Sequence, residues 1–390
     1  MQTTYRFRLY PCEEQEDRLS ETLELCRRVY NHFLSQWNRG TRIPCRLELQ
    51  AQLPLLKKER PELSKVYSKV LQMALYQLYS NLKALSQLKR NGKRVGRLRF
   101  KGRGRFKTLI YNQSGFKIVK TGKRLNLLRL SKIGDIPIRV HREVEGNMKQ
   151  VVIKRHNSGK WFACISIEKG THVEKRNVNR PIGIDMGIKH FLTDSEGRQI
   201  ENPTFYERTL GNIKVEQKRL ARKKRDSKNR KKQRVKLAKL CERLVNQRND
   251  FLHKLSRFYV DNYDAICVED LNVSNMVRNH NLAGKILDAS WGRFLQMLAY
   301  KAEGAGKLVG KVNPRGTSKE YKHGELDRDY NASLNILERG LSGLGWPPVP
   351  VEMRPLQAIP ANLIVEAGNP LKPWVTHVGQ LDLYRYRGEP

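Results

Sequence analysis

The fold is decided by the stretch Pro181-Ile-Gly-Ile-Asp-Met-Gly187, in which a short aliphatic run ends on the carboxylate of Asp185. A second aliphatic run, Ala265-Ile-Cys-Val268, ends in the same way on Glu269. Short apolar runs of this kind are typical of buried strands. Two strands that each end on an acid predict two carboxylates at one edge of a sheet.

A third acid stands before an amphipathic segment. Asp329 lies in Asp327-Arg-Asp-Tyr-Asn-Ala332, just ahead of the helix that we predict over residues 332–341. Three carboxylates brought together repel one another unless cations lie between them, and oxygen ligands favour magnesium. Two magnesium ions about 3.5–4 Å apart can clamp a phosphodiester, one activating water and the other stabilising the leaving oxygen. We therefore predict Asp185, Glu269 and Asp329 as catalytic metal ligands.

Each acid also has a purely structural interpretation. Asp185 suits a turn, Glu269 an exposed strand end, and Asp329 the N-cap of the following helix. The order of the three acids, together with their neighbours, favours the catalytic interpretation. Gly183 and Gly187 flank Asp185, and we expect them to let a nucleic-acid backbone approach it closely.

The composition indicates a polyanionic partner. The 390 residues include 76 Lys and Arg against 38 Asp and Glu, a formal net charge of +38. Such an excess repels itself in a compact protein unless a nucleic acid or a membrane surface neutralises it. The basic residues are spread over most of the chain, and no apolar run approaches the roughly 18–20 residues of a spanning helix. We therefore expect the partner to be a nucleic acid and do not expect the protein to bind a membrane.

Cysteine usage and the N-terminus indicate a cytoplasmic protein. Six cysteines are scattered without a CxxC pair, so we expect no disulfide framework. The first residues lack the apolar core of a secretion signal. We therefore expect the protein to work in a reduced cytosol.

The hydrophobic period divides the chain into segments. Residues 3–9 alternate as in a half-exposed strand, and amphipathic helices are predicted over 13–37 and 62–90. Short alternating runs then predict a small β-barrel or sheet, into which the first strand is expected to pair. These runs are residues 98–100, 116–119, 136–140, 151–153 and 162–165.

Beyond residue 180 the order is strand, hairpin, helix, strand, helix, strand, helix, which is an α/β pattern. The tail after Trp346 is rich in proline and shows no clear period, so we expect it to be peripheral or disordered. The predicted domains are residues 1–10 (first strand of the β domain), 11–92 (helical), 93–175 (β-rich), 176–345 (α/β with a basic helical insertion) and 346–390 (tail).

Two basic segments are predicted to contact nucleic acid. The run over residues 214–234 is too dense for an ordinary solvated helix face and suits phosphate neutralisation, although a flexible basic arm is the alternative. Residues 97–106 interleave aromatics with cations, which suits stacking on unpaired bases; a basic outer strand face is the alternative. The predicted contact residues are Arg97, Arg99, Lys101, Arg103, Arg105, Phe106, Arg222, Lys223, Lys224, Arg225, Arg230, Lys231 and Lys232.

Three acidic blocks carry a family resemblance. Gly-Ile-Asp-Met-Gly (183–187), Val-Glu-Asp-Leu-Asn (268–272) and Asp-Arg-Asp-Tyr-Asn-Ala-Ser-Leu-Asn-Ile-Leu (327–337) resemble, in this order, the three RuvC blocks of TnpB. TnpB is a transposon-encoded nuclease related to type V CRISPR effectors. The likeness extends to segments 5–11, 26–31, 111–115, 300–302 and 312–318, and so covers roughly residues 3–341.

The resemblance implies a fold and an activity. The fold is an RNase H-like RuvC core (176–345), a β-barrel wedge domain (1–10 and 93–175) and an inserted helical recognition domain (11–92). The activity is magnesium-dependent cleavage of double-stranded DNA by a monomer, directed by a guide RNA made from the transposon end. The family's metal ligands match Asp185, Glu269 and Asp329, which leaves Asp327 as a weaker candidate.

By analogy with type V effectors, guide pairing reads the target and the protein reads a short flanking motif. Gln72, Asn112 and Gln113 are amide side chains suited to base edges, and they lie in segments that resemble the family's motif-reading region.

One departure from the family pattern concerns zinc. The family usually carries two CxxC pairs before its third acidic block, whereas residues 319–326 contain no cysteine, and His323 alone cannot make a four-ligand site. We therefore predict no structural zinc. Two alternatives to the guided nuclease stay open. One is an RNA-guided DNA-binding protein with weak or no cleavage, and the other is a guide-free RNase H-fold recombinase, which is expected to purify without a specific long RNA.

Overall fold

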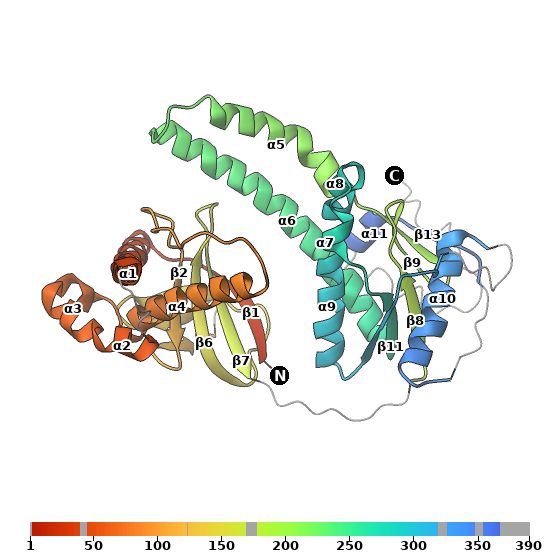
Figure 1. Ribbon diagram of the computed structural model, residues 1–390, viewed down its shortest axis with the longest axis horizontal. Helices are drawn as coiled ribbons and strands as arrows, with labels where there is room; N and C mark the ends of the chain where they lie inside the picture. Colours follow the sequence, from red (N-terminus) through yellow and green to blue (C-terminus); the bar gives the residue numbers. More distant parts are fainter. Residues whose placement is uncertain are drawn as a thin grey trace. The chain divides into compact units, whose positions relative to one another are not determined.

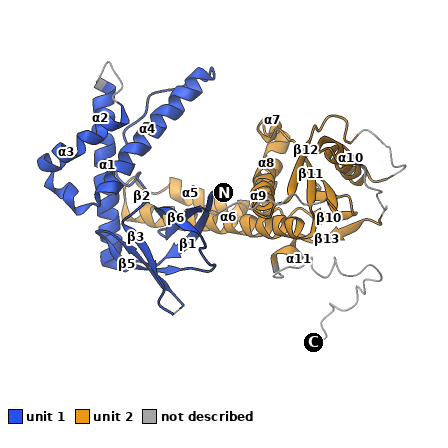
Figure 2. Ribbon diagram, turned by 90° about the horizontal axis from the view of Figure 1, so that it is seen from below, with its two compact units in different colours: residues 1–170 blue, residues 171–390 orange. Residues whose placement is uncertain are grey.

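The structure is a computed structural model that describes residues 2–39, 45–122, 124–168, 178–318, 326–347 and 354–366. The chain forms two compact units, Met1–Gly170 and Thr171–Pro390, which are coloured separately in Figure 2. None of the helices in the described residues has the length and apolar character needed to span a bilayer.

The described part of unit 1 contains a seven-stranded sheet with the order β2-β6-β7-β1-β5-β4-β3. Figure 1 labels β1, β2, β6 and β7 of this sheet. The first strand pairs along its whole length with β7, from Gln2 opposite Glu168 to Leu9 opposite Trp161, so its predicted pairing into the later strands is confirmed. The strands are β1 (Gln2–Leu9), β2 (Thr108–Asn112), β3 (Phe116–Val119), β4 (Asn126–Leu130), β5 (Gly134–Arg139), β6 (Asn147–Arg155) and β7 (Trp161–Glu168).

The helices of unit 1 are inserted between β1 and β2. They are α1 (Glu13–Arg39), α2 (Arg46–Ala51), α3 (Leu53–Glu59), the 3-10 helix η1 (Pro61–Lys65) and α4 (Ser68–Arg90). The long helices α1 and α4 pack against each other and against β2, and their apolar faces join one core with the sheet. The single helix predicted over 62–90 is wrong at its start, because Val66 is extended and separates η1 from α4.

The strand predicted at residues 98–100 is also wrong. All of residues 91–107 are described, and none forms a strand. The Lys101 backbone N–H donates to Asn31 Oδ1 at 2.8 Å, and the Lys101 carbonyl accepts from Asn31 Nδ2 at 3.0 Å and from Arg27 at 2.8 Å. Side chains of α1 therefore satisfy backbone groups that a neighbouring strand would otherwise bind.

The described part of unit 2 contains a six-stranded sheet with the order β12-β11-β8-β9-β10-β13. Strands β8, β11 and β12 are parallel, and β9 is antiparallel to both β8 and β10. This arrangement agrees with the predicted α/β pattern. The strands are β8 (Pro181–Asp185), β9 (His190–Asp194), β10 (Arg198–Glu201), β11 (Ala265–Glu269), β12 (Leu308–Val312) and β13 (Gln357–Ile359).

Helices cover both faces of this sheet. Helix α10 packs on one face of β8, β11 and β12, whereas α6 and α9 contribute to the core on the other face (Figure 1). The helices are α5 (Phe205–Ala221), α6 (Lys228–Asn262), α7 (Val273–Met276), α8 (His280–Ala289), α9 (Trp291–Gly304), α10 (Arg328–Gly343) and α11 (Ala361–Glu366).

The expectation of a peripheral or disordered tail is wrong for residues 354–366. Strand β13 pairs in parallel with β10, with Ile359 opposite Ile200, and both Ile359 and Ile364 are fully buried in the core that α6 also lines. A three-residue strand and a six-residue helix are too short to carry a hydrophobic period, which is why the sequence pattern missed them. Residues 367–390 lie outside the described residues.

This packing predicts that the tail stabilises unit 2. We expect Ile364→Ala to lower the free energy of unfolding by about 2–5 kcal/mol, since it leaves a cavity in the core. The adjacent Leu363 is 40% exposed, and Leu363→Ala is expected to change stability by no more than about 0.5 kcal/mol. Urea denaturation of the two variants checks this, and equal losses would contradict the packing role of α11.

Candidate active site

Two of the predicted acids end adjacent parallel strands. Strands β8 and β11 pair in register, with Ile182 opposite Ile266 and Ile184 opposite Val268. Asp185 and Glu269 are the next residues, so both carboxylates lie at the same edge of the sheet. Both side chains are buried.

The third acid comes from the start of α10, where the structure separates two neighbouring carboxylates. Asp327 is the N-cap, and its Oδ1 accepts from the backbone N–H groups of Asp329 at 3.1 Å and Tyr330 at 3.2 Å. Asp329 lies in the first turn, and its side chain lines a cleft together with Asp185 and Glu269. The capping role considered for Asp329 thus belongs to Asp327.

A glycine in β8 allows α10 to lie this close. A Cβ at Gly183 would lie 2.8 Å from the backbone nitrogen of Leu337 and closer still to the Ser333 carbonyl, both in α10. The expectation that Gly183 admits a nucleic-acid backbone is therefore wrong, because α10 covers it. Gly187 does lie beside the acids, since a Cβ there would be 3.8 Å from Asp329 Oδ2.

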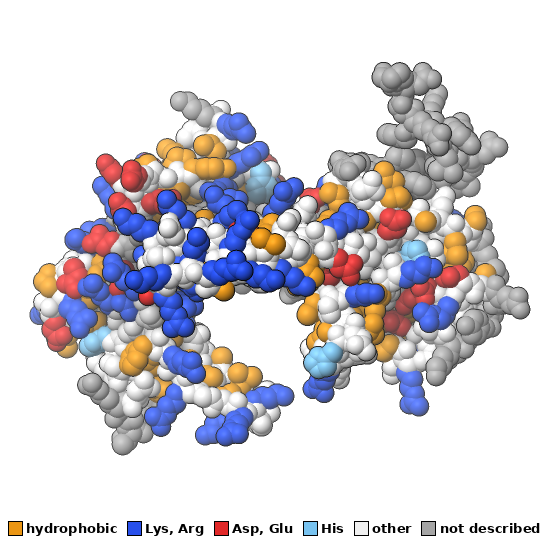
Figure 3. Space-filling model, turned by 90° about the horizontal axis from the view of Figure 1, so that it is seen from above, with side chains coloured by type: hydrophobic (Ala, Val, Ile, Leu, Met, Phe, Trp, Pro, Cys, Tyr) orange, Lys and Arg blue, Asp and Glu red, His pale blue; other side chains and the backbone are white. Residues whose placement is uncertain are grey.

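The cleft has a volume of about 710 Å³ and is formed entirely within unit 2. Acidic side chains (red) gather on this unit in Figure 3, although the chain as a whole is basic. The described residues that line the cleft are Asp185, Met186, Gly187, Ile188, Lys189, Asn202, Thr204, Glu207, Glu269, Leu271, Met276, Lys285, Asp288, Trp291, Ser318, Arg328 and Asp329.

The electrostatics of the cleft favour a bound cation. Burial, together with the charges of Glu269 and Asp329, raises the pKa of Asp185 to about 7 against the opposing effect of Arg328. Burial also raises the pKa of Glu269, whose Oε1 accepts a hydrogen bond from the Thr317 hydroxyl at 2.5 Å. A divalent cation among these carboxylates would remove their mutual repulsion.

The three carboxylates do not form a compact single-ion site. Within the described ranges, no three His, Cys, Asp or Glu side chains lie close enough together to hold a single ion. The donor chemistry nevertheless fits magnesium, because three carboxylates that repel one another line one cleft and supply the oxygen ligands that this ion prefers. His323 and the shortened segment around it lie outside the described residues.

Thr317 is a site residue that the sequence reasoning missed. It is fully buried, and its hydroxyl orients Glu269 from the segment after β12. The sequence feature that could have indicated Thr317 is its position in segment 312–318, which resembles the family. A single threonine, however, forms no motif that marks it as a site residue. Lys189 and Lys285, which also line the cleft, were missed for the same reason.

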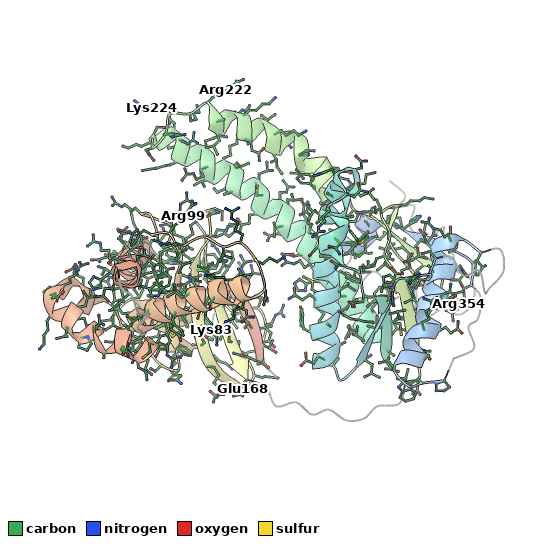
Figure 4. All side chains as sticks on the ribbon, viewed as in Figure 1. Lys83, Arg99, Glu168, Arg222, Lys224 and Arg354 are labelled. Atoms are coloured by element: carbon green, nitrogen blue, oxygen red, sulfur yellow. The ribbon has the colours of Figure 1, made fainter. Side chains whose placement is uncertain are left out.

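The basic run over 214–234 forms a hairpin of two long helices, in place of the alternative flexible arm. Buried Glu216 on α5 joins the two helices, because its carboxylate pairs with Lys236 on α6 at 3.0 Å. Within α5 the same carboxylate pairs with Arg219 at 2.7 Å. Figure 4 labels Arg222 and Lys224 at the tip, where both side chains point outward. The exposed predicted contacts on this hairpin are Arg222, Lys223, Lys224, Arg225, Lys231 and Lys232.

Arg230 has a structural role in the same hairpin. Its Nη1 donates to the carbonyls of Leu220 and Lys223, each at 2.8 Å. These bonds close the connection between α5 and α6, so this guanidinium is partly occupied before any nucleic acid binds.

Residues 97–106 divide into exposed cations and a buried aromatic. Arg97, Arg99, Arg103 and Arg105 are exposed, and Lys101 is half-buried. Phe106 is buried against Tyr30, with ring centroids 6.1 Å apart, so its predicted stacking on unpaired bases is wrong. Phe100, which is 56% exposed, is the accessible aromatic of this segment.

The three amides predicted to read a flanking motif all lie in unit 1. Gln72 lines a groove with residues of α2 and α3. Asn112 ends β2, and exposed Gln113 follows it with φ +63°. Tyr67, just before α4, fixes this turn through its hydroxyl contact with Ser114 at 2.9 Å.

Three family profiles match the chain. A profile described as "Probable transposase" matches residues 164–280, and "Cas12f1-like, TNB domain" matches 291–336. A "Helix-turn-helix domain" profile matches residues 1–40, which form β1 and α1 in this structure.

Relatives extend these matches over most of the chain. A protein of Streptomyces pristinaespiralis named "Putative RNA-guided DNA endonuclease" is 31% identical, over 87% of this chain and 89% of its own length. The InsQ protein of Escherichia coli K12, with the same descriptive name, is 27% identical over 92% and 98%. "TnpB-like protein L79" of Acanthamoeba polyphaga mimivirus is 29% identical, over 41% of this chain and 37% of its own length.

A solved structure resembles the fold. The Cas12f1 chain of a complex with sgRNA and target DNA aligns with a TM-score of 0.53 at 11% identity, over 86% of this chain and 98% of that chain. The sheet order, the acidic cleft and this alignment define a RuvC-containing fold of the effector kind. The sequence matches are more specific, and the chain belongs to the TnpB family.

The contact between α10 and β8 predicts a stability effect. Gly183→Ala is expected to lower the free energy of unfolding by about 1–3 kcal/mol, because the added methyl group meets the α10 backbone. Gly211 lies within α5 with open space around it, and Gly211→Ala is expected to stabilise the protein by up to about 1 kcal/mol. Urea denaturation measures both, and a Gly183→Ala variant as stable as the wild type would contradict the packing.

Proposed function

We propose that the protein is an RNA-guided DNA endonuclease that hydrolyses phosphodiesters with magnesium held by Asp185, Glu269 and Asp329. The observation that carries this proposal is that three acids from separate segments of a very basic chain line one cleft. The names of the Streptomyces and E. coli relatives support the same activity.

The side chains of the cleft have distinct roles in this proposal. Bound magnesium ions would supply the positive charge that activates water and stabilises the leaving oxygen. Asp185, Glu269 and Asp329 provide the oxygen ligands, and Thr317 keeps the Glu269 carboxylate oriented through its 2.5 Å hydrogen bond. Asp327 holds the first turn of α10, and with it Asp329, by capping the helix.

The basic surfaces bind guide and target in this proposal. The tip of the α5–α6 hairpin and the exposed arginines of residues 97–105 contact phosphates without reading sequence. Residues 11–92 serve as a recognition domain, and the sheet of unit 1 serves as a wedge domain. Gln72, Asn112 and Gln113 read the short motif beside the target, while the guide pairs with the target itself.

We further propose that one copy of the chain binds one guide RNA transcribed from the transposon end. The target is double-stranded DNA. Size-exclusion chromatography with light scattering of the purified complex tests the copy number.

The first experiment tests the chemistry. The protein is expressed with its flanking transposon DNA, the RNA that purifies with it is sequenced, and plasmids carrying the matching target are incubated with magnesium or EDTA. We expect cleavage in magnesium alone, and we expect Asp185→Asn to lower the rate at least about 1,000-fold, since it removes a metal ligand. RNA binding by the variant is expected to stay unchanged.

Matched results separate the alternatives. Asp327→Asn retains a capping oxygen outside the cleft and is expected to cut within about threefold of the wild type. An Asp185→Asn variant that cuts as fast as the wild type would refute the site assignment. A complex that binds target without cutting would indicate the DNA-binding alternative, and a protein free of specific RNA would indicate the recombinase.

The hairpin predicts a salt-dependent loss of RNA affinity. Replacing Arg222 and Lys224 by Gln removes two exposed cations, and the slope of log affinity against log salt is expected to fall by about 0.7 per lost single-strand contact. Arg257→Gln, at the other end of α6 where Arg257 pairs with Asp261, is the control. Filter binding over a salt series measures the slopes, and identical slopes would argue against phosphate contacts at the tip.

A further inference from the structure

Two lysines in the acidic cleft have no role in the chemistry described above. Lys189 and Lys285 both line the cleft and are exposed. Within the described ranges, neither ammonium group has a hydrogen-bond or ion-pair partner. Arg328, another cation of the cleft, differs because it pairs with Asp329 at 3.2 Å.

The backbone that carries each lysine is held in place. Lys189 lies in the connection between β8 and β9, where the Asn202 side chain donates to the Ile188 carbonyl at 3.2 Å. Lys285 lies on α8, three residues before Asp288, so the two side chains share one face of the helix. The backbone that carries each lysine is therefore held at the edge of the cleft.

Asp288 fastens α8 to the neighbouring helices. Its buried carboxylate pairs with Arg248 of α6 at 2.6 Å and accepts from the Tyr206 backbone N–H at 3.0 Å, at the start of α5. Because Arg248 neutralises Asp288, this acid does not need Lys285 as its partner. Lys285 is left for a ligand.

The negative charge of the cleft repels a polyanionic substrate. Metal ions between the three carboxylates can neutralise this repulsion for the scissile phosphate. The phosphates on either side of it need a different source of positive charge. Ammonium groups are suited to those phosphates, since a lysine binds phosphate as a point charge.

We propose that Lys189 and Lys285 bind the phosphates that flank the scissile phosphate and so align the target strand against the carboxylates. This inference rests on the proposed nuclease function. The ligand chemistry is the backbone of a single nucleic-acid strand in the cleft, and base identity plays no part in it.

The test uses the purified protein–RNA complex and a target strand with methylphosphonates, which are uncharged, at the two phosphates beside the mapped cut. With the native strand we expect Lys189→Ala and Lys285→Ala each to lower the single-turnover rate at saturating target about tenfold, the effect of one lost charge-assisted hydrogen bond. Arginine at either position is expected to restore most of the rate.

A double-mutant cycle that combines the lysine variants with the methylphosphonate strand isolates the contact between the lysines and the phosphates. The methylphosphonates are expected to slow the wild type but to have little further effect on the double variant, because the same interaction is already lost. Lys311→Ala removes an exposed cation of β12 that pairs with Asp270 outside the cleft, and it is expected to leave the rate unchanged. Equal slowing of wild type and double variant by the methylphosphonates would overturn the proposal.

A binding measurement keeps this result separate from the nuclease proposal. With calcium in place of magnesium, which carboxylate oxygens also bind, the double variant is expected to reduce the salt slope of target-strand affinity by about 1.4, or 0.7 for each lost contact. A wild type that does not cut in magnesium refutes the nuclease proposal, whereas the slope in calcium still decides the lysines. An unchanged slope would overturn their assignment even in an active nuclease.

Discussion

The close contact between α10 and β8 is the constraint on which the cleft depends. Because Gly183 has no side chain, the backbone of α10 lies directly against the strand that ends in Asp185. The first turn of that helix then brings Asp329 to the same edge of the sheet as Glu269. Folding must stabilise three mutually repelling carboxylates, and the apolar packing of α10 on the sheet supplies part of that stabilisation.

A second buried network ties the basic hairpin to this sheet. Helix α6 runs from the tip of the hairpin to the core, where its Tyr259 hydroxyl donates to Asp194 at 2.8 Å. Asp194 also pairs with Arg198 at 2.6 Å, which makes it a fully compensated buried charge. Since Asp194 lies opposite Ile184 in the strand pairing, the hairpin is anchored next to the strand that carries Asp185. The tip that we propose to bind phosphates and the acids thus belong to one continuous framework within unit 2.

Charge is divided in this molecule according to what each surface has to bind. The hairpin tip and the arginines of residues 97–105 expose cations suited to phosphate backbones, whereas the cleft concentrates carboxylates suited to metal ions. Lys189 and Lys285 line the same cleft as the carboxylates, so cations and acids lie side by side there. In the nuclease that we propose, the carboxylates hold the ions and the lysines hold the strand, so neither group has to do both.

The sequence by itself determined the strands that end in Asp185 and Glu269, because a short aliphatic run bounded by turn residues has few other structures open to it. It also determined the order of the α/β elements and the long helix α1, whose amphipathic period extends over many turns. Only the tertiary structure decided which of Asp327 and Asp329 caps α10, that Phe106 is buried while Phe100 is exposed, and that residues 354–366 complete the second sheet. These outcomes depend on contacts between residues far apart in the chain, and a local pattern carries no record of such contacts.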